Sequence, residues 1–311
     1  MQLLPRQARK SVDTPAQSRP IRPIRHTNPG PASGNSTKFD TFSIFDTMTT
    51  TATMRGNAIG SQPSFNKKRM LGEAMIEAVG LSKFYGDFAA TRNVSFSIPR
   101  GQICAFLGPN GAGKSTTMKL LTGYLAPTEG RASIAGFDVQ SQRLQAAAHL
   151  GYLPENGPLY PDMTPLSLLR FFGAARGLSG ARLRDRIEAV VDQCFLQTVL
   201  EKSIAKLSKG YRQRVGMAQV LLHEPDVLIM DEPTTGLDPN QIREVRTLIR
   251  RLGENKTILL STHILQEVEA VANRVIMVAG GSVVFDGEPA GLLAHGPTFD
   301  DAFHALTGGA Q

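Results

Sequence analysis

The sequence predicts an α/β fold whose core is a mostly parallel sheet flanked by helices, with an antiparallel β-subdomain and a helical subdomain. The apolar runs 103–107 and 227–230 are bounded by turn residues, as expected for strands buried on both faces. Residues 94–98 alternate between apolar and polar side chains, which predicts an antiparallel strand with one exposed face. Short strands and helical segments then alternate along the chain, the pattern of an α/β protein.

The segment after the first apolar run fits the pattern G-x-x-x-x-G-K-S of a phosphate-binding loop and predicts a P-loop nucleotide triphosphatase (NTPase) core. A helix-like run, residues 116–121, leaves the segment, so the strand–loop–helix context is present. The glycines let successive backbone N–H groups close around a phosphate, and the helix N-terminus adds positive potential. We expect Lys114 to reach the β- and γ-phosphates and Ser115 to hold Mg²⁺. The nucleotide-binding residues expected in this loop are Gly108, Pro109, Asn110, Gly111, Ala112, Gly113, Lys114, Ser115 and Thr116.

Two carboxylates, Asp231 and Glu232, directly follow the apolar run 227–230. Ligands of open α/β sheets bind outside the carboxyl ends of the strands. We therefore expect Asp231 to support Mg²⁺ through water and Glu232 to act as the general base for an attacking water. The alternative, two solvated turn carboxylates, is disfavoured because a phosphate-binding loop occurs in the same chain.

Further motifs follow in a fixed order: L-S-K-G-Y at 207–211, D-V-L-I-M-D-E-P at 226–233, G-L-D-P at 236–239 and S-T-H at 261–263. Their order and spacing resemble the ATP-binding cassette (ABC) family in its transporter branch, over roughly residues 73–307. The resemblance implies that His263 contacts the γ-phosphate and orients the water. It also implies a head-to-tail dimer with two ATP molecules sandwiched, in which each phosphate loop faces Ser208 and Gly210 of the other copy, and in which the loop of Asp238 crosses the interface. The chain departs from the common L-S-G-G-Q at Lys209 and Tyr211 but keeps Ser208 and Gly210.

Two further contacts are implied by the same resemblance. Tyr85 is expected to stack on the adenine, although Phe84 or Phe88 could take that position instead. Glu155 stands where the family usually has glutamine. An ionised glutamate offers only acceptors and adds a negative charge. We expect Glu155 to take part in the nucleotide site and to bind Mg²⁺, but its contacts with the water must differ from those of a glutamine. The loop of Glu155 leads into the helical insert that touches the membrane partner in the family.

The helical insert has clear local signals. Thr164 followed by Pro165 predicts a helix N-cap and first helical residue. One apolar helix face is formed by Leu183, Ile187, Val190, Val191 and Cys194. We expect a second helix over residues 211–222, opened by Ser208 and Gly210, whose N-terminus is an anion site.

The chain of 311 residues divides by charge and composition. Residues 1–70 hold 11 Lys and Arg against 3 Asp and Glu, whereas residues 71–311 hold 23 against 24. We expect 1–70 to be a disordered basic extension, 71–290 to be the ABC ATPase domain with its helical subdomain at about 156–222, and 291–311 to be a short helical tail. Residues 1–70 could also be a transit peptide, or translation could start at Met70 or Met75. The folded part has no basic excess, so nucleic acid is not the expected partner.

The function expected from these features is the ATP-binding and hydrolysing subunit of a membrane exporter. We expect it to work as a homodimer, and only one cassette is present in the chain. No run of 18 apolar residues occurs, so the membrane pore is expected in a separate permease, with this subunit on the cytoplasmic face. Cys104 and Cys194 are expected as buried thiols. The C-terminal segment 299–308 resembles the tails of gliding-motility, copper-processing and drug-export ATPases.

Two other functions remain open. A soluble cassette ATPase acting on ribosomes or DNA usually carries two cassettes or a long coiled coil, whereas Ser115 and Leu207 here lie only 92 positions apart. A switch that binds ATP without hydrolysing it is disfavoured by the presence of Glu232 and His263.

Overall fold

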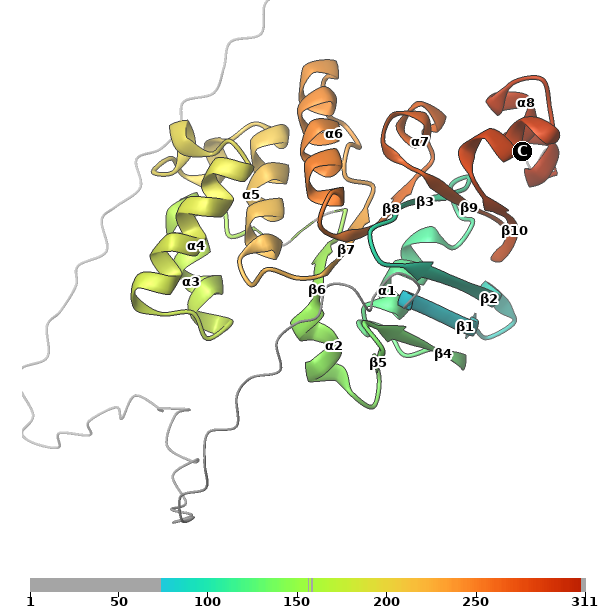
Figure 1. The fold of residues 1–311 in the computed structure, drawn as a ribbon, viewed down its shortest axis with the longest axis horizontal. Coiled ribbons are helices and arrows are strands. Elements are labelled where there is room, and N and C mark those ends of the chain that lie inside the picture. The colour runs from blue at the N-terminus through green and yellow to red at the C-terminus, as the bar shows by residue number, and fades with distance from the viewer. Residues whose placement is uncertain (1–73, 156, 158, 309–311) are drawn as a thin grey trace, which may run out of the picture. The chain divides into compact units, whose positions relative to one another are not determined.

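The computed structural model describes residues 74–155, 157 and 159–308, and these form two sheets with helices around them (Figure 1). The basic segment 1–70, expected to be disordered, lies outside the described residues. The α/β fold predicted from the sequence, with its antiparallel and helical parts, is confirmed.

The larger sheet has six strands in the order β10-β9-β3-β8-β7-β6. The five strands from β9 to β6 run parallel, and β10 pairs antiparallel with β9 at one edge. Every residue of β3 and β7 is buried, as their continuous apolar runs predict. The strands are β3 (Ile103–Leu107), β6 (Leu150–Leu153), β7 (Val227–Asp231), β8 (Thr257–Thr262), β9 (Arg274–Ala279) and β10 (Ser282–Gly287).

The smaller sheet is antiparallel, with the order β2-β1-β4-β5. Within residues 94–98, the three apolar side chains are buried and the two serines are exposed, so the predicted alternation is confirmed. The strands are β1 (Ala74–Tyr85), β2 (Phe88–Pro99), β4 (Glu129–Ile134) and β5 (Phe137–Asp138).

The larger sheet carries a separate hydrophobic core on each face. In β3, Ala105 belongs to the core shared with the helices of the helical subdomain, whereas Cys104 and Phe106 belong to the core shared with α1 and the smaller sheet. Because successive strand residues point to opposite faces, one strand supplies both cores. Burial raises the pKa of each of the two cysteine thiols to about 12, and both thiols are buried as predicted.

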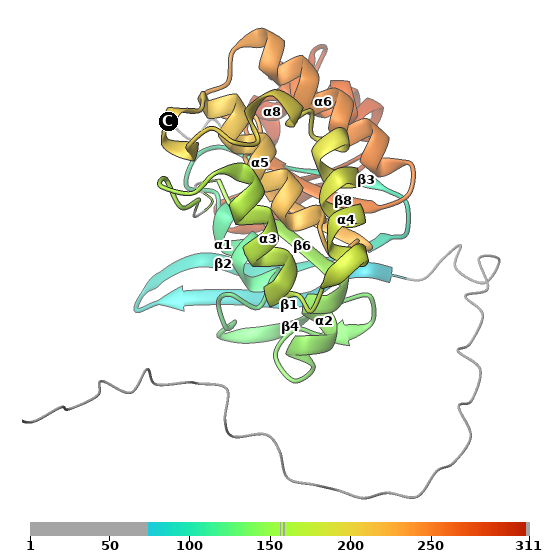
Figure 2. The same cartoon turned by 90° about the vertical axis from the view of Figure 1, so that its left-hand side faces the viewer.

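The helices that cover these faces fall into four groups. The helices α1 (Lys114–Leu121) and α2 (Arg143–His149) lie near the smaller sheet, while α6 (Pro239–Gly253) and α7 (Leu265–Val271) follow β7 and β8. The 3₁₀ turn η4 (Pro289–Ala294) and α8 (Phe299–Thr307) pack against β9 and β10. The helical subdomain comprises α3 (Pro165–Ala175), α4 (Gly180–Gln193), the short 3₁₀ turns η2 (Gln197–Val199) and η3 (Ile204–Lys206), and α5 (Lys209–Leu221), which pack on one another (Figure 2).

Local signals explain where the subdomain helices begin. The hydroxyl of Thr164 accepts the N–H of Ser167, with Pro165 as the first helical residue of α3, as predicted. Along α4, Ile187, Val190 and Val191 are buried, in agreement with the predicted apolar face. The helix α5 begins two residues before its expected start, because the hydroxyl of Ser208 caps it by accepting the N–H of Tyr211.

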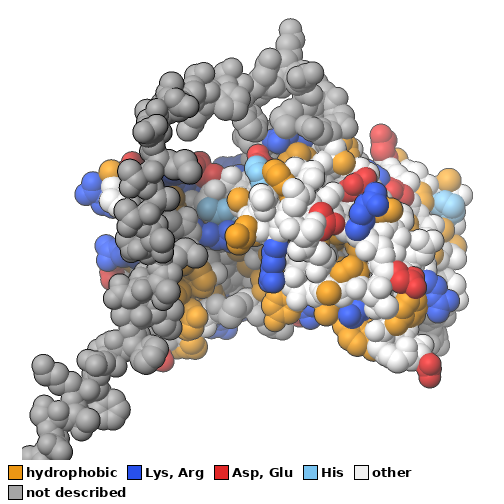
Figure 3. Space-filling model, turned by 90° about the horizontal axis from the view of Figure 1, so that it is seen from below, with side chains coloured by type: hydrophobic (Ala, Val, Ile, Leu, Met, Phe, Trp, Pro, Cys, Tyr) orange, Lys and Arg blue, Asp and Glu red, His pale blue; other side chains and the backbone are white. Residues whose placement is uncertain are grey.

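Basic and acidic side chains are interspersed on the face seen in Figure 3. No helix within the described residues is both long and apolar enough to span a bilayer.

Candidate active site

Three strand ends of the larger sheet meet at one edge. Leu107 at the end of β3 pairs with Thr262 of β8, and Asp231 at the end of β7 pairs with Ser261 of the same strand. The residues that follow these strand ends, the phosphate-loop glycine Gly108 among them, therefore emerge side by side. This edge is the place where ligands of parallel sheets bind.

The phosphate loop is shaped by a close approach to β2. Gly113 has a φ of 97° and caps α1 in the left-handed conformation. A Cβ atom at Gly113 would lie 2.3 Å from the carbonyl oxygen of Ala90, so only glycine fits this position without displacing the strand. Helix α1 begins directly afterwards at Lys114, two residues before the start predicted from the sequence, and its free N–H groups face the cavity described below.

The Lys114 ammonium is buried and held by the loop itself. Its Nζ donates to the carbonyl oxygens of Gly108 (2.9 Å) and Pro109 (3.2 Å), and the side chain is 6% exposed. Its third neighbour is Glu232, whose Oε1 lies 3.5 Å away. The loop thus presents a positive charge at the level of the helix N-terminus, where a phosphate would be attracted.

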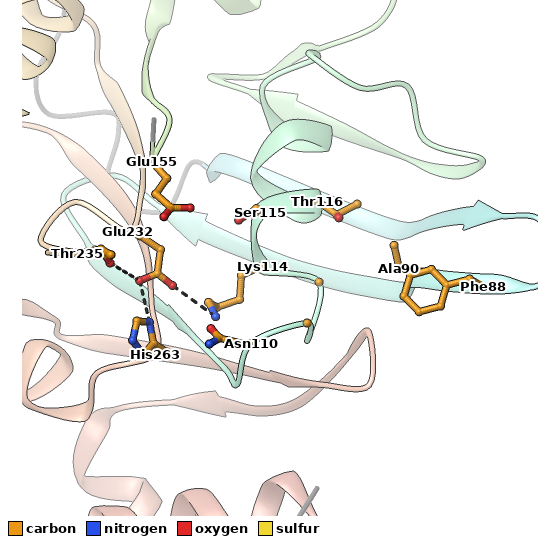
Figure 4. Close-up of a pocket in the computed structure, with 12 residues that line it drawn as sticks. Phe88, Ala90, Asn110, Lys114, Ser115, Thr116, Glu155, Glu232, Thr235 and His263 are labelled. Atoms are coloured by element: carbon orange, nitrogen blue, oxygen red, sulfur yellow. Dashed lines mark hydrogen bonds and ion pairs between the residues drawn. The ribbon is translucent and has the colours of Figure 1, made fainter. Parts of the chain in front are cut away.

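Glu232 lies at the centre of the site (Figure 4). Its Oε2 accepts the hydroxyl of Thr235 (2.9 Å) and lies 2.8 Å from Nδ1 of His263. A carboxylate only accepts, so Nδ1 of His263 carries the proton in this contact. Glu232 has a φ of 50°, in the left-handed region that residues other than glycine rarely adopt, and its N–H donates to Oγ of Ser261 (3.0 Å). Such backbone strain is common at functional sites.

Asp231, the last residue of β7 and the residue before Glu232, is 3% exposed. Its Oδ1 accepts the hydroxyls of Ser261 (2.5 Å) and Ser115 (3.2 Å). A carboxylate and a hydroxyl oxygen next to a phosphate site form the kind of donor set that holds Mg²⁺, which is usually bound by one or two carboxylates together with substrate phosphates and water. Ser115 and Asp231 therefore fit the metal predicted for them.

A cavity of about 430 Å³ joins six of the nine residues predicted for the phosphate loop to Glu155, Glu232 and His263. The other three loop residues, Gly108, Pro109 and Ala112, do not line it. Glu155, which follows β6, extends toward Ser115 across it (Figure 4) and also lines a second cavity of about 620 Å³ beside α1, together with Asp231. The first cavity is lined by Phe88, Ala90, Asn110, Gly111, Gly113, Lys114, Ser115, Thr116, Glu155, Glu232, Thr235 and His263.

One of the aromatic residues considered for the adenine lies at this cavity. Phe88 lines the cavity, whereas Tyr85 does not and its ring lies 5.5 Å from Nζ of Lys83. Tyr85 and Phe88 are paired across the β1–β2 turn, and both rings are exposed. Of the aromatic residues considered for adenine, the structure brings Phe88 to the cavity.

Ser208, Gly210 and Asp238 lie outside the cavity lining. In Figure 1, α5 is well separated from α1. Gly210 packs against α6, since a Cβ atom there would lie 2.5 Å from Cδ of Gln241. Asp238 caps α6 by accepting the N–H groups of Asn240 and Gln241 (both 3.0 Å). These three residues thus lie at the N-terminal ends of α5 and α6, outside the cavity of the phosphate loop in their own chain.

Three site residues were not predicted from the sequence: Ala90, which lines the cavity from β2, Thr235 and Ser261. Thr235 lies three residues after Glu232, a spacing that lets a hydroxyl return to the carboxylate across a turn. Ser261 precedes Thr262 and His263 at the end of a buried strand, and its hydroxyl bridges Asp231 and the N–H of Glu232. The available signal for Ser261 was a hydroxyl near the end of a strand that neighbours the strand ending in a carboxylate.

Comparison with known proteins finds two matching family models. Residues 91–235 match the model described as "ABC transporter", and a shorter stretch, 203–269, matches one described as "AAA domain, putative AbiEii toxin, Type IV TA system". The chain is 39% identical over 243 residues to the probable multidrug ABC transporter ATP-binding protein YbhF of Escherichia coli, covering 76% of this chain but only 42% of that protein. The chain thus spans less than half the length of this relative.

A second relative and a solved structure match over most of their lengths. The Nod factor export ATP-binding protein I of Cupriavidus metallidurans is 36% identical over 222 residues, covering 71% of this chain and 73% of that protein. The dimeric structure of a bacterial ABC transporter cassette superimposes with a TM-score of 0.64 at 25% identity, covering 69% of this chain and 99% of that one.

Proposed function

The chain belongs to the ABC transporter family, and on that basis we propose that it is the ATP-binding and ATP-hydrolysing subunit of a membrane exporter. The observation that carries hydrolysis is the position of the Glu232 carboxylate, which lies between Lys114 and His263 at the mouth of the phosphate loop. Export is supported by the names of the relatives, a multidrug transporter protein and a Nod factor exporter.

Residues of this chain supply most of the hydrolytic machinery. The N–H groups at the start of α1 and the Lys114 ammonium hold the β- and γ-phosphates, and a γ-phosphate bound there takes Lys114 away from Glu232. Glu232 then accepts the proton of a water that attacks the γ-phosphorus, while Thr235 and His263 hold its Oε2 in place. The bond from the γ-phosphorus to the bridging oxygen breaks, and ADP leaves with phosphate as the second product. Mg²⁺, held by Ser115 and Asp231, would neutralise charge on the phosphate oxygens. The substrate is thus positioned and its developing charge stabilised, which is the main requirement of phosphoryl transfer.

We extend the proposal to a dimer of two copies of this chain. Ser208 and the N-terminus of α5 form an anion site, yet neither lines the phosphate cavity of their own chain. A second copy arranged head to tail would bring them to the γ-phosphate. The solved cassette that resembles this chain is a dimer, which supports this arrangement.

The proposed membrane partner is a separate permease bound at the cytoplasmic face. Tyr160, Phe171 and Phe172 form an aromatic cluster on α3 and the loop before it, with ring centroids 5.2 to 6.4 Å apart. Tyr160 is 50% exposed and Phe171 is 52% exposed. Exposed aromatic clusters are characteristic of contact surfaces, so this cluster is the proposed contact with the permease. The loop carrying Tyr160 begins at Glu155, so the ATP cavity and this surface share one segment.

The proposal is tested by ATP hydrolysis of the full chain and its Glu232→Gln variant. Glutamine keeps the shape of the side chain but cannot accept the proton, so we expect the rate to fall by at least ~10²-fold. ATP binding without hydrolysis by the unaltered chain would point to the non-hydrolysing switch. Equal rates for the two proteins would show that another group activates the water.

A further inference from the structure

A buried carboxylate on α7 lies outside the cavity lining but directly behind it. Glu267 is 2% exposed and is the acidic residue in the first turn of α7. Burial is the largest influence on this carboxyl and raises its pKa. Burying a carboxyl group costs free energy unless its oxygens are hydrogen-bonded. The hydrogen-bond partners of Glu267 therefore indicate its role.

Both partners of Glu267 come from the turns that carry the reacting groups. The hydroxyl of Thr234 donates to Oε1, and the hydroxyl of Thr262 donates to Oε2 at 2.6 Å. Thr234 lies two residues after Glu232, and Thr262 directly precedes His263. One side chain therefore joins the turn after β7 to the turn after β8.

The Thr262 hydroxyl also organises the backbone of its turn. Oγ of Thr262 accepts the N–H of Ile264 at 3.0 Å, which fixes the chain on both sides of His263. After Glu232, whose φ is 50°, the turn is closed by the N–H of Thr235, which donates to the carbonyl oxygen of Glu232 (3.2 Å). A left-handed non-glycine residue persists only when its surroundings fix it, and Thr234, held by Glu267, lies inside this turn.

We propose that Glu267 is a positioning residue for ATP hydrolysis: it bridges Thr234 and Thr262 and so sets the distance and orientation between Glu232 and His263. Glu267 touches neither ATP nor water in this role and acts only through the two threonines. The inference rests on the function proposed above, because it assumes that Glu232 and His263 act together on the attacking water.

The test compares three variants of the full chain in steady-state ATP hydrolysis. Glu267→Leu removes the bridge at similar volume. Glu267→Gln retains it, because an amide can accept from one threonine and donate to the other. Glu269→Leu removes an exposed charge from the same helix and is the matched control.

We expect Glu267→Leu to lower kcat by at least ~10-fold while KM for ATP changes less than ~2-fold, because misplacement of a reacting group by about 1 Å can cost ~10²-fold. Glu267→Gln should recover most of the rate, and Glu269→Leu should match the unaltered chain. A purely structural role would lower melting temperature and leave the kcat of the folded fraction unchanged. Unchanged kcat in Glu267→Leu, or equal losses in the leucine and glutamine variants, would overturn the proposal.

If Glu267→Leu does not fold, Thr262→Val and Thr234→Val take its place, since each removes one arm of the bridge with little change of shape. Each is expected to lower kcat at nearly constant KM, and full activity in both would overturn the bridge. Glu232→Gln is measured in the same assay. Loss of activity there, combined with full activity of the bridge variants, refutes only the role of Glu267, whereas full activity of Glu232→Gln refutes the proposed function.

Discussion

Replacing Gly113 by alanine should cost more stability than the same change at Gly111, although both glycines belong to the phosphate loop. Both have positive φ, 97° and 79°, so alanine at either position bears the left-handed penalty of about 1–2 kcal/mol. At Gly111 no atom lies within 4 Å of the added Cβ, whereas at Gly113 the carbonyl oxygen of Ala90 lies 2.3 Å away. Relieving such a backbone contact adds about 1–3 kcal/mol.

The free energy of unfolding of both variants and of the unaltered chain is measured by urea-induced unfolding. In a separate experiment, the affinity of each folded protein for a fluorescent ATP analogue is measured. The difference of about 1–3 kcal/mol in the free energy of unfolding between Gly113→Ala and Gly111→Ala corresponds to roughly 2–12 °C in melting temperature for a domain of this size. Gly113→Ala should also weaken ATP binding more strongly, because the loop can escape Ala90 only by moving away from β2. Equal losses of stability in the two variants would refute the argument that the contact with β2 shapes the loop.

Four further outcomes are expected. Lys114→Ala should abolish tight ATP binding, measured by isothermal titration, because the cavity loses its buried positive charge; binding of normal strength would contradict this. Phe88→Ala should weaken ATP binding several-fold and Tyr85→Ala should not, since only Phe88 lines the cavity; the reverse order would restore the assignment to Tyr85. Glu155→Gln should keep basal hydrolysis but raise the Mg²⁺ concentration needed for half-maximal rate, because an amide–Mg²⁺ contact lacks charge assistance; an unchanged midpoint would show that Glu155 does not touch the metal. Burial lowers the pKa of His223 to about 4, so as pH falls from 6.5 to 4 the unfolded chain takes up a proton that the folded chain refuses and stability is lost; the free energy of unfolding of His223→Gln should fall less over this interval, and an equal fall would contradict the assignment.

The sequence predicted the parts of the fold that depend on local pattern. The strand β3 and the caps at Thr164 and Ser208 follow from apolar runs and from hydroxyls placed before helices. The reacting groups Glu232 and His263 could be found because each follows a buried strand, and parallel strands end at one edge of the sheet.

Features that depend on packing between distant segments could not be predicted in this way. The position of Phe88 in the cavity is set by the register of the β1–β2 hairpin, in which Tyr85 and Phe88 are opposite each other. The bridge through Glu267 requires α7 to pack behind two turns that are 28 residues apart at Thr234 and Thr262. The sequence contains these residues but no periodicity that joins them.

The most direct test of the account is the mass of the Glu232→Gln variant in the presence of ATP and Mg²⁺, measured by light scattering. If the carboxylate is the base and two copies enclose the nucleotide, ATP binds, the dimer closes and hydrolysis cannot reopen it. We expect the dimer mass for Glu232→Gln, and a return to monomers for the unaltered chain once its ATP is consumed. A variant that stays monomeric at saturating ATP, or that returns to monomers as fast as the unaltered chain, would contradict the account.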